Sequence, residues 1–200
     1  MLDSWTDFEM DTADAQDADA ITALVQSAYR GDVSRQGWTT EADLLEGQRI
    51  GPGMVREELS DPNKVILLFR AGAGSVGEDG EAGTGAANGR RPLVACCQLE
   101  RKNDSAYFGM FAVSPSRQGG GIGKNVLTGA EAFARQTWGA TRISLSVINL
   151  RAELIAWYQR RGYELTGESE PFPYGDDRFG RPTTDELRFL MMTKSLAEGR

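Results

Sequence analysis

The stretch FAVSPSRQGGGIGKNVL, residues 111–127, decides the fold. An apolar strand ends at Val113, a Ser-Pro-Ser turn follows, and four glycines lie between Gln118 and Lys124, where a helix begins. Glycine adopts backbone conformations closed to other residues and lets a ligand approach the chain closely. The free N–H groups at the start of the helix converge on one point and favour an anion there. The stretch therefore predicts a strand, turn and helix that bind a diphosphate.

Two common phosphate-binding motifs do not fit this turn. A Walker A motif ending at Gly123 and Lys124 needs glycine where Gln118 stands, and Ser or Thr where Asn125 stands. A dinucleotide-binding GxGxxG pattern needs glycine at position 124 or 126, which hold Lys124 and Val126. These mismatches argue against a nucleotide-dependent kinase or dehydrogenase.

The spacing that does fit is [Q/R]xxGxG, at residues 118–123. With this motif the chain resembles the GCN5-related N-acetyltransferase (GNAT) superfamily, in which the turn binds the pyrophosphate of acetyl-coenzyme A. A second superfamily motif, NxxA…YxxxG[FY], is similar to Asn149, Ala152, Tyr158, Gly162 and Tyr163. The spacing from Asn149 to Tyr158 is two residues longer than the commonest one, whereas the spacing from Tyr158 to Gly162 is retained. The resemblance covers nearly all of the chain outside residues 71–91.

The resemblance implies that the chain is an N-acetyltransferase. Acetyl would pass from acetyl-coenzyme A directly to a primary amine in a ternary complex, without a covalent enzyme intermediate. Tyr158 would protonate the departing thiolate, and Glu41 or Glu100 would help the amine to lose its proton. A non-catalytic module that binds acyl-coenzyme A is the alternative, because the glycine turn serves both functions. The implied cofactor-binding residues are Phe111, Ala112, Val113, Gln118, Gly119, Gly120, Gly121, Ile122, Gly123, Lys124 and Asn149.

Hydrophobic patterns along the chain predict the remaining elements. We expect strands at 8–12, 64–69, 93–100, 105–113, 142–148 and 163–167, and one within 185–196. Helices are expected at 14–30, within 38–47, at 54–59, 119–138 and 151–161. These elements favour one α/β (α+β) domain over residues 1–200, with a mixed, mostly antiparallel sheet of about 6–7 strands flanked by about 4–5 helices. Residues 71–91, with seven glycines and no aromatic residue, predict a disordered insertion between two neighbouring strands.

Composition narrows the chemistry further. The chain of 200 residues has no histidine, which excludes Ser-His-Asp and Cys-His catalysis and any zinc site built on histidine, so we expect no metal. Cys96 and Cys97 are adjacent and have apolar flanks, which indicates reduced structural thiols. The formal net charge of -7 argues against nucleic acid as a partner and weakly favours a cationic acceptor, either a small amine or a peptide amine.

Location and acceptor binding are predicted from weaker signals. The first residues carry no basic and apolar signal segment, and no apolar run reaches membrane-spanning length, so we expect a cytoplasmic or nuclear protein. We expect it to be a monomer or a homodimer. Trp38, Phe172 and Tyr174 are candidates for the wall of an acceptor cleft, whereas core packing is the expected role of Trp157. The segment PFPYGDDRFGRP, residues 171–182, is typical of a substrate-covering loop.

Overall fold

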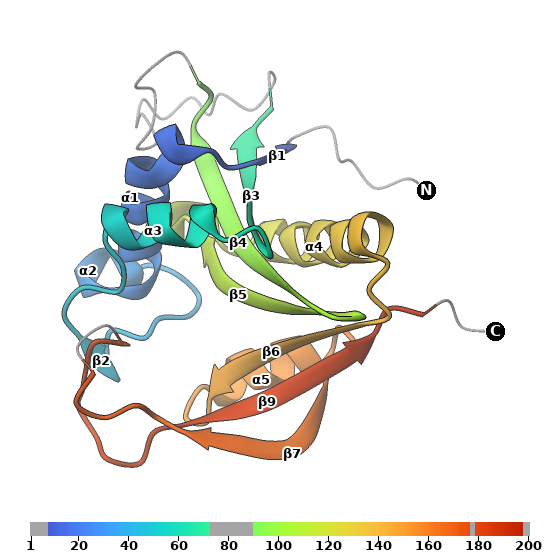
Figure 1. Ribbon diagram of the computed structural model, residues 1–200. Helices are drawn as coiled ribbons and strands as arrows, with labels where there is room; N and C mark the ends of the chain where they lie inside the picture. Colours follow the sequence, from blue (N-terminus) through green and yellow to red (C-terminus); the bar gives the residue numbers. More distant parts are fainter. Residues whose placement is uncertain (1–7, 73–89, 177–178, 198–200) are drawn as a thin grey trace.

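The computed structural model describes residues 8–72, 90–176 and 179–197. Its centre is a sheet of seven strands in the order β1-β3-β4-β5-β6-β9-β7 (Figure 1). Neighbouring strands are antiparallel except β5 and β6, which confirms the predicted mixed, mostly antiparallel sheet. The strands are β1 (Phe8–Thr12), β3 (Lys64–Ala71), β4 (Leu93–Lys102), β5 (Ser105–Val113), β6 (Arg142–Ile148), β7 (Glu164–Pro171) and β9 (Arg188–Ser195).

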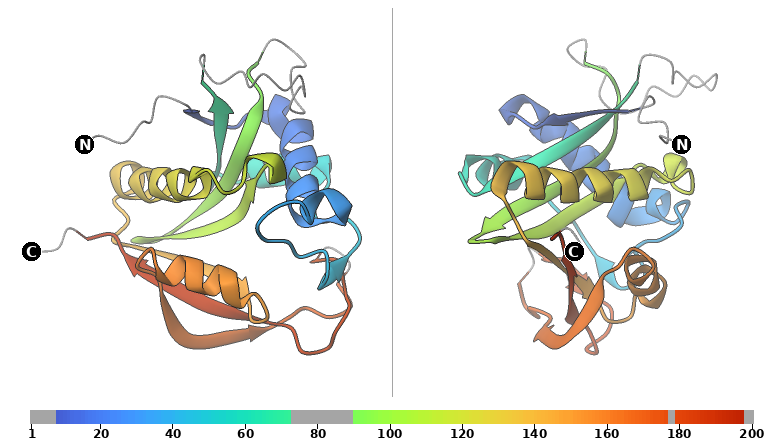
Figure 2. Two further views of the ribbon diagram at one scale, coloured as in Figure 1. Left: turned by 180° about the vertical axis from the view of Figure 1, so that it is seen from behind. Right: turned by 90° about the vertical axis from the view of Figure 1, so that its right-hand side faces the viewer.

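Helices cover both faces of this sheet. On β3, Ile66 and Leu68 face one apolar cluster and Leu67 and Phe69 face the other, because side chains alternate along a strand. The helices α1 (Ala18–Tyr29) and α3 (Pro52–Ser60) pack on the first face. The helices α4 (Ile122–Trp138) and α5 (Ala152–Gln159) lie on the opposite face, as Figure 2 shows. The central strands are therefore buried on both sides.

The helix α1 forms where the apolar spacing predicts it. Ile21, Leu24 and Val25 are almost fully buried, so one stripe of the helix faces the sheet. Before it, a short helical turn, η2 (Ala15–Asp17), is closed by a capping box between Asp14 and Asp17. These contacts place the C-terminal end of α1, with Tyr29, beside the middle of the sheet.

The sheet opens between β5 and β6, and this opening positions the site. The two strands pair only over Ser105–Tyr107 and Arg142–Ser144, and they diverge beyond that point (Figure 1). On its other side, β5 carries a bulge, since the register with β4 shifts between Cys96 and Gln98. Met110, inside the bulge, has a φ of 45°, which non-glycine residues rarely adopt. Bulges commonly redirect strands next to functional sites.

The helix predicted within residues 38–47 is wrong. Residues 41–44 form turns, in which the carbonyl of Glu41 accepts hydrogen bonds from the N–H groups of Leu44 and Leu45. A two-residue strand, β2 (Leu45–Glu46), then pairs with β8 (Arg181–Pro182). The segment is too short to hold a helix by local bonds alone, so distant pairing decides its structure. The further short helices are α2 (Gly31–Ser34) and η4 (Pro115–Arg117).

The predicted glycine-rich insertion at 71–91 lies mostly outside the described residues. The strands on its two sides, β3 and β4, are antiparallel neighbours in the sheet, as expected. None of the described helices has the length and apolar character needed to cross a bilayer.

Candidate functional site

The glycine turn at residues 118–123 forms the open entrance to α4. Gly119 has a φ of 90° and Gly121 a φ of 82°, which favour glycine. A Cβ atom added at Gly119, Gly120 or Gly121 would meet nothing within 4 Å. Gly121 is the N-cap of α4, and no side chain caps this end of the helix. The first N–H groups of α4 are therefore available to an anion.

Gly123 serves a different purpose in the same turn. A Cβ atom at this position would lie 3.3 Å from the ring atom Cζ of Phe111 and 3.3 Å from Cζ2 of Trp157. Glycine thus lets the start of α4 lie against aromatic rings from β5 and α5. Because Gly123 has no side chain, the glycine turn can lie close to the end of β5 and to α5.

Two cavities lie beside this arrangement. The turn cavity, about 330 Å³, lies between the glycine turn and α5, and the strand cavity, about 630 Å³, lies over the opening between β5 and β6. Both volumes are in the range of cofactor and substrate sites. We call the place where the cavities meet the junction. Its residues line both cavities and are Tyr29, Phe111, Arg151, Leu154 and Tyr158.

Tyr158, the predicted acid, lies at this junction. Its side chain is buried, and we find no hydrogen-bond partner for its hydroxyl within the described residues. Burial raises the pKa of Tyr158 well above its ordinary value of 10.0. The phenol therefore keeps its proton at neutral pH and can donate it to a ligand in either cavity.

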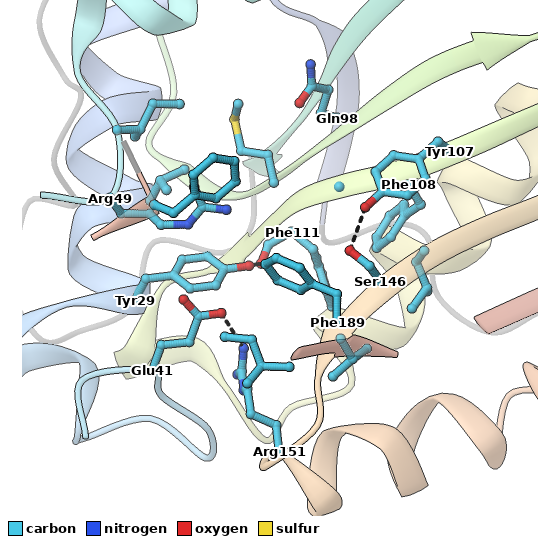
Figure 3. Close-up of a pocket in the computed structure, with 18 of the residues that line it drawn as sticks. Tyr29, Glu41, Arg49, Gln98, Tyr107, Phe108, Phe111, Ser146, Arg151 and Phe189 are labelled. Carbon is cyan, nitrogen blue, oxygen red and sulfur yellow. Dashed lines mark hydrogen bonds and ion pairs between the residues drawn. The ribbon is translucent and has the colours of Figure 1, made fainter. Parts of the chain in front are cut away.

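Tyr29 faces the same point from α1. Its hydroxyl donates a hydrogen bond of 2.5 Å to the carbonyl oxygen of Phe111, so one carbonyl of the open β5 edge is occupied. Burial, with the nearby charge of Glu41, raises the pKa of Tyr29 to about 12. Figure 3 shows Tyr29, Glu41, Phe111 and Arg151 gathered at one end of the strand cavity. Tyr29 is thus a fixed donor that helps to hold the bulged strand.

Glu41 lines the strand cavity, but its carboxylate is bound by two guanidinium groups. Nη1 of Arg30 lies 2.9 Å from Oε2, and Nη1 of Arg151 lies 2.9 Å from Oε1. Burial alone would raise the pKa of Glu41, but Arg151, Arg49 and Arg30 outweigh it and hold the pKa below the ordinary value. A carboxylate held in this way is a weak base, so the geometry favours an anchoring role.

Glu100 and Asn149 lie outside both cavities. Glu100 faces Tyr107 across the β4–β5 ladder, and its carboxylate lies 3.4 Å from Nζ of Lys102. The side-chain oxygen of Asn149 accepts from the backbone N–H of Arg188 at 2.9 Å, and its amide donates to the carbonyl of Glu186 at 3.1 Å. The amide of Asn149 therefore supports the start of β9.

Arg151 was missed by the sequence reasoning, although a signal for it was present. Asn149 stands two residues too early for the commonest superfamily spacing, and the residue at that spacing from Tyr158 is Arg151. Arg151 lines both cavities, whereas Asn149 lines neither. Counting back from the better-matched Tyr158 would have identified it.

The other predicted cofactor-binding residues divide into three groups. Those lining the turn cavity are Phe111, Val113, Gln118, Gly119, Gly121, Gly123 and Lys124. Ala112 and Ile122 are 1% and 6% exposed and pack into the core, which leaves only their backbone groups for a ligand. Gly120 is exposed and lies in the turn without lining the cavity.

Aromatic and basic side chains close the turn cavity. The rings of Trp38 and Trp157 lie 6.4 Å apart between centroids, and the guanidinium of Arg161 lies 3.5 Å from the ring centroid of Trp157. Arg160 also lines this cavity. Core packing was the expected role of Trp157, and the structure places this residue in the lining of the turn cavity as well. Together with Lys124 the two arginines make this cavity cationic.

The loop expected to cover the acceptor contributes less than predicted. Phe172 is 3% exposed in a small core, Tyr174 is 45% exposed, and neither lines a cavity. Pro171, Pro173 and Phe179 do line the strand cavity. Residues 177–178 of this segment lie outside the described residues.

Cys96 and Cys97 are free thiols in the interior. Both are 0% exposed on β4, in agreement with the predicted structural role. Burial raises the pKa of Cys96 to about 12 and that of Cys97 well above its ordinary value. Neither thiol is suited to act as a nucleophile near neutral pH.

Comparisons with known proteins agree with the geometry. Over 169 residues the chain is 28% identical to a streptothricin acetyltransferase from Streptomyces lavendulae, covering 80% of this chain and 83% of that protein. The fold matches a nourseothricin acetyltransferase with a TM-score of 0.60 and 20% identity, covering 96% and 100% of the two chains. It also matches the ribosomal-protein-S18-alanine N-acetyltransferase from Escherichia coli with a TM-score of 0.62 and 14% identity, covering 96% of each chain.

The family comparison covers the central part of the structure. The family model described as Acetyltransferase (GNAT) family matches residues 53–163, more than half of the chain. This range contains the glycine turn, the bulged strand β5, the helix α4 and Tyr158. The chain is therefore an acetyltransferase that belongs to the GNAT family.

Proposed function

We propose that this protein transfers the acetyl group of acetyl-coenzyme A to a primary amine of a small cationic acceptor of the streptothricin type. The observation that carries the proposal is the junction. The turn cavity and the strand cavity meet at Tyr29, Phe111, Arg151, Leu154 and Tyr158, so a donor and an acceptor can react directly there. We also propose a cytoplasmic location for the reaction, which cell fractionation would test.

The donor would occupy the turn cavity. The N–H groups at the start of α4 suit the pyrophosphate, and Lys124, Arg160 and Arg161 supply charge for the phosphates. Beyond Tyr107 the edge of β5 is not paired with β6, so its backbone groups can bond the pantetheine amides. An N–H group near Val113 would polarise the thioester carbonyl.

The transfer step requires a free amine and a route for one proton. The amine nitrogen attacks the thioester carbon, the C–N bond forms, and the C–S bond then breaks with its electron pair on sulfur. Tyr158 gives its hydroxyl proton to the sulfur and takes the surplus proton of the nitrogen, so the phenol ends neutral. Free coenzyme A and an N-acetyl amide are the products. The burial that keeps Tyr158 protonated fits this relay.

The acceptor would occupy the strand cavity. Glu58 and Glu170 line this cavity, and since the carboxylate of Glu58 is paired with Lys64, that of Glu170 suits an acceptor with additional positive charge. The relative found by sequence acts on streptothricin, as its name states, and related folds include a spermidine/spermine N-acetyltransferase from Vibrio cholerae. A small amine is thus the acceptor class that these observations favour.

A panel of amines tests this function. The protein is mixed with acetyl-coenzyme A and, separately, with streptothricin, spermidine and a peptide with an N-terminal alanine, and free thiol and product mass are measured. We expect rapid thiol release with streptothricin. Acetyl-coenzyme A binding without release for any amine would indicate the non-catalytic binding module instead. Thermal stabilisation by ATP or NAD but not by acetyl-coenzyme A would contradict the proposal altogether.

A further inference from the structure

A cluster of charged side chains with a net positive charge lies beside the junction. Three guanidinium groups, of Arg30, Arg49 and Arg151, surround the single carboxylate of Glu41, which gives a net charge of +2 for these four side chains. Arg49 and Arg151 both line the strand cavity, and Figure 3 shows them on either side of Tyr29 and Glu41. An amine that reaches the junction therefore meets positive charge.

The structure holds these charges in place. Arg151 donates to Glu41 at 2.9 Å and, through Nη2, to the hydroxyl of Thr39 at 2.8 Å. Arg30 donates to the other oxygen of Glu41 and is itself buried. The guanidinium of Arg49 lies 5.5 Å from the ring centroid of Tyr29, and it has no ion-pair partner within the described residues. Low solvent exposure strengthens the field of such a cluster.

The neighbouring groups do not cancel this charge. Tyr29 and Tyr158 at the junction, and the nearby Cys96, are neutral near pH 7 because their pKa values are raised. In the strand cavity, Glu58 is bound by Lys64 at 2.7 Å and by the amide of Gln98. The other charged groups that line the cavities are Glu170 of β7 in the strand cavity, and Lys124, Arg160 and Arg161 in the turn cavity. Tyr107 also lines the strand cavity, and its hydroxyl is hydrogen-bonded to that of Ser146.

Resting on the proposed function, we propose that the net positive charge of the Arg30–Arg49–Arg151–Glu41 cluster keeps the bound acceptor amine neutral and nucleophilic, in place of a general base. Nearby positive charge disfavours an ammonium, whose proton then passes to water before the attack. The same field stabilises the thiolate that leaves the acetyl group. The cluster thereby promotes loss of the amine proton, the step that Glu41 or Glu100 was expected to assist.

Arg49 is the best position for the test, because removing its charge breaks no ion pair within the described residues. Arg49→Lys keeps the charge, Arg49→Gln removes one unit, and Arg49→Glu removes two. The single-turnover rate of acetyl transfer to streptothricin is measured against pH with both substrates saturating. The rate rises as the bound amine loses its proton, so the midpoint reports the pKa of that amine in the complex.

We expect the midpoint of the pH profile to be unchanged in Arg49→Lys. It should rise by about one pH unit in Arg49→Gln and by about twice as much in Arg49→Glu. Below the midpoint, Arg49→Gln would be about tenfold slower than the wild-type protein. Equal midpoints in all four proteins would overturn the inference. Equal shifts in Arg49→Lys and Arg49→Gln would also overturn it, because the shape of the side chain rather than its charge would then matter.

A second readout needs no acceptor. The thiolate absorbance of bound coenzyme A is titrated in the wild-type protein and in Arg49→Gln. We expect the thiol pKa to be lower in the wild-type complex than in free coenzyme A, and to rise in Arg49→Gln. A thiol pKa equal to that of free coenzyme A would contradict the inference about the charge cluster. A lowered thiol pKa together with a lack of acetyl transfer to any amine would contradict the proposed function instead.

Discussion

The backbone N–H of Trp38 donates a hydrogen bond of 2.7 Å to Oε1 of Gln118, which lies 80 residues further along the chain. The amide nitrogen of Gln118 donates in turn to the carbonyl oxygen of Val113 at 3.1 Å. Gly37 allows this approach, because a Cβ atom there would lie 2.6 Å from Oε1 of Gln118. One side chain thus ties the loop after α2 to the strand end and to the glycine turn.

Replacing Gln118 is expected to loosen the turn cavity more than it weakens the fold. Gln118→Ala removes two hydrogen bonds worth about 1 kcal/mol each, and we expect acetyl-coenzyme A to bind about three- to tenfold more weakly by calorimetry. The exposed Gln136 on α4 provides a control, since Gln136→Ala should leave the affinity unchanged. Unchanged affinity in Gln118→Ala would show that the loop holds its place without this bond.

The glycine turn offers a matched pair of substitutions. Gly121 has a φ of 82°, whereas Gly120 lies outside the left-handed region, and neither position is crowded. Gly121→Ala is therefore expected to lower the free energy of unfolding by about 1–2 kcal/mol and to weaken acetyl-coenzyme A binding. Gly120→Ala should have little effect on the free energy of unfolding or on acetyl-coenzyme A binding. Urea unfolding and calorimetry measure the two effects, and equal behaviour of the variants would contradict the role given to backbone conformation.

Much of the fold could be predicted because its signals are local. The apolar run at residues 64–69 predicted a strand, and β3 forms there between the two apolar clusters. The glycine turn was recognised from the backbone conformations that glycine alone adopts easily. Tyr158 was proposed from its spacing to Gly162, which follows the end of α5 and has a φ of 86°.

The rest depends on contacts between distant residues. The bond between Arg151 and Glu41 joins residues 110 positions apart, and nothing in the local sequence indicates it. The same ion pairs bury Glu41, which a hydrophobic pattern treats as a solvent-exposed charge. The pairing of β2 with β8 replaced the predicted helix for a similar reason. Sequence patterns describe single elements, whereas the Arg30–Arg49–Arg151–Glu41 cluster forms where four segments meet.

The Glu41 carboxylate is expected to matter for stability. Glu41→Gln leaves Arg30 and Arg151 buried without their counter-charge, which should lower the free energy of unfolding by about 3–5 kcal/mol. Glu57→Gln, at an exposed position on α3, is the control. Because the folded-state pKa of Glu41 is lowered, its stabilisation is present above the ordinary value of 4.5 and is lost as the pH falls through the folded-state value.

Urea unfolding between pH 7 and pH 3 measures this contribution. We expect the difference between the wild-type protein and Glu41→Gln to be largest at neutral pH and to shrink as the pH falls. A difference that stays constant over this range would contradict the ionised state assigned to the carboxylate. A folded variant with wild-type stability would show that the two arginines find other partners.

Tyr158→Phe separates catalysis from binding at the junction. Its hydroxyl has no hydrogen-bond partner within the described residues, so its removal should change the free energy of unfolding little. Loss of the acid should lower the single-turnover rate of acetyl transfer by about 10²–10⁴-fold, while acetyl-coenzyme A binds as before. Tyr174→Phe, outside both cavities, is the control for loss of a hydroxyl away from the junction, although it also removes two hydrogen bonds to the backbone of Leu187. An unchanged rate in Tyr158→Phe across pH, with binding intact, would assign protonation of the thiolate to another group or to water.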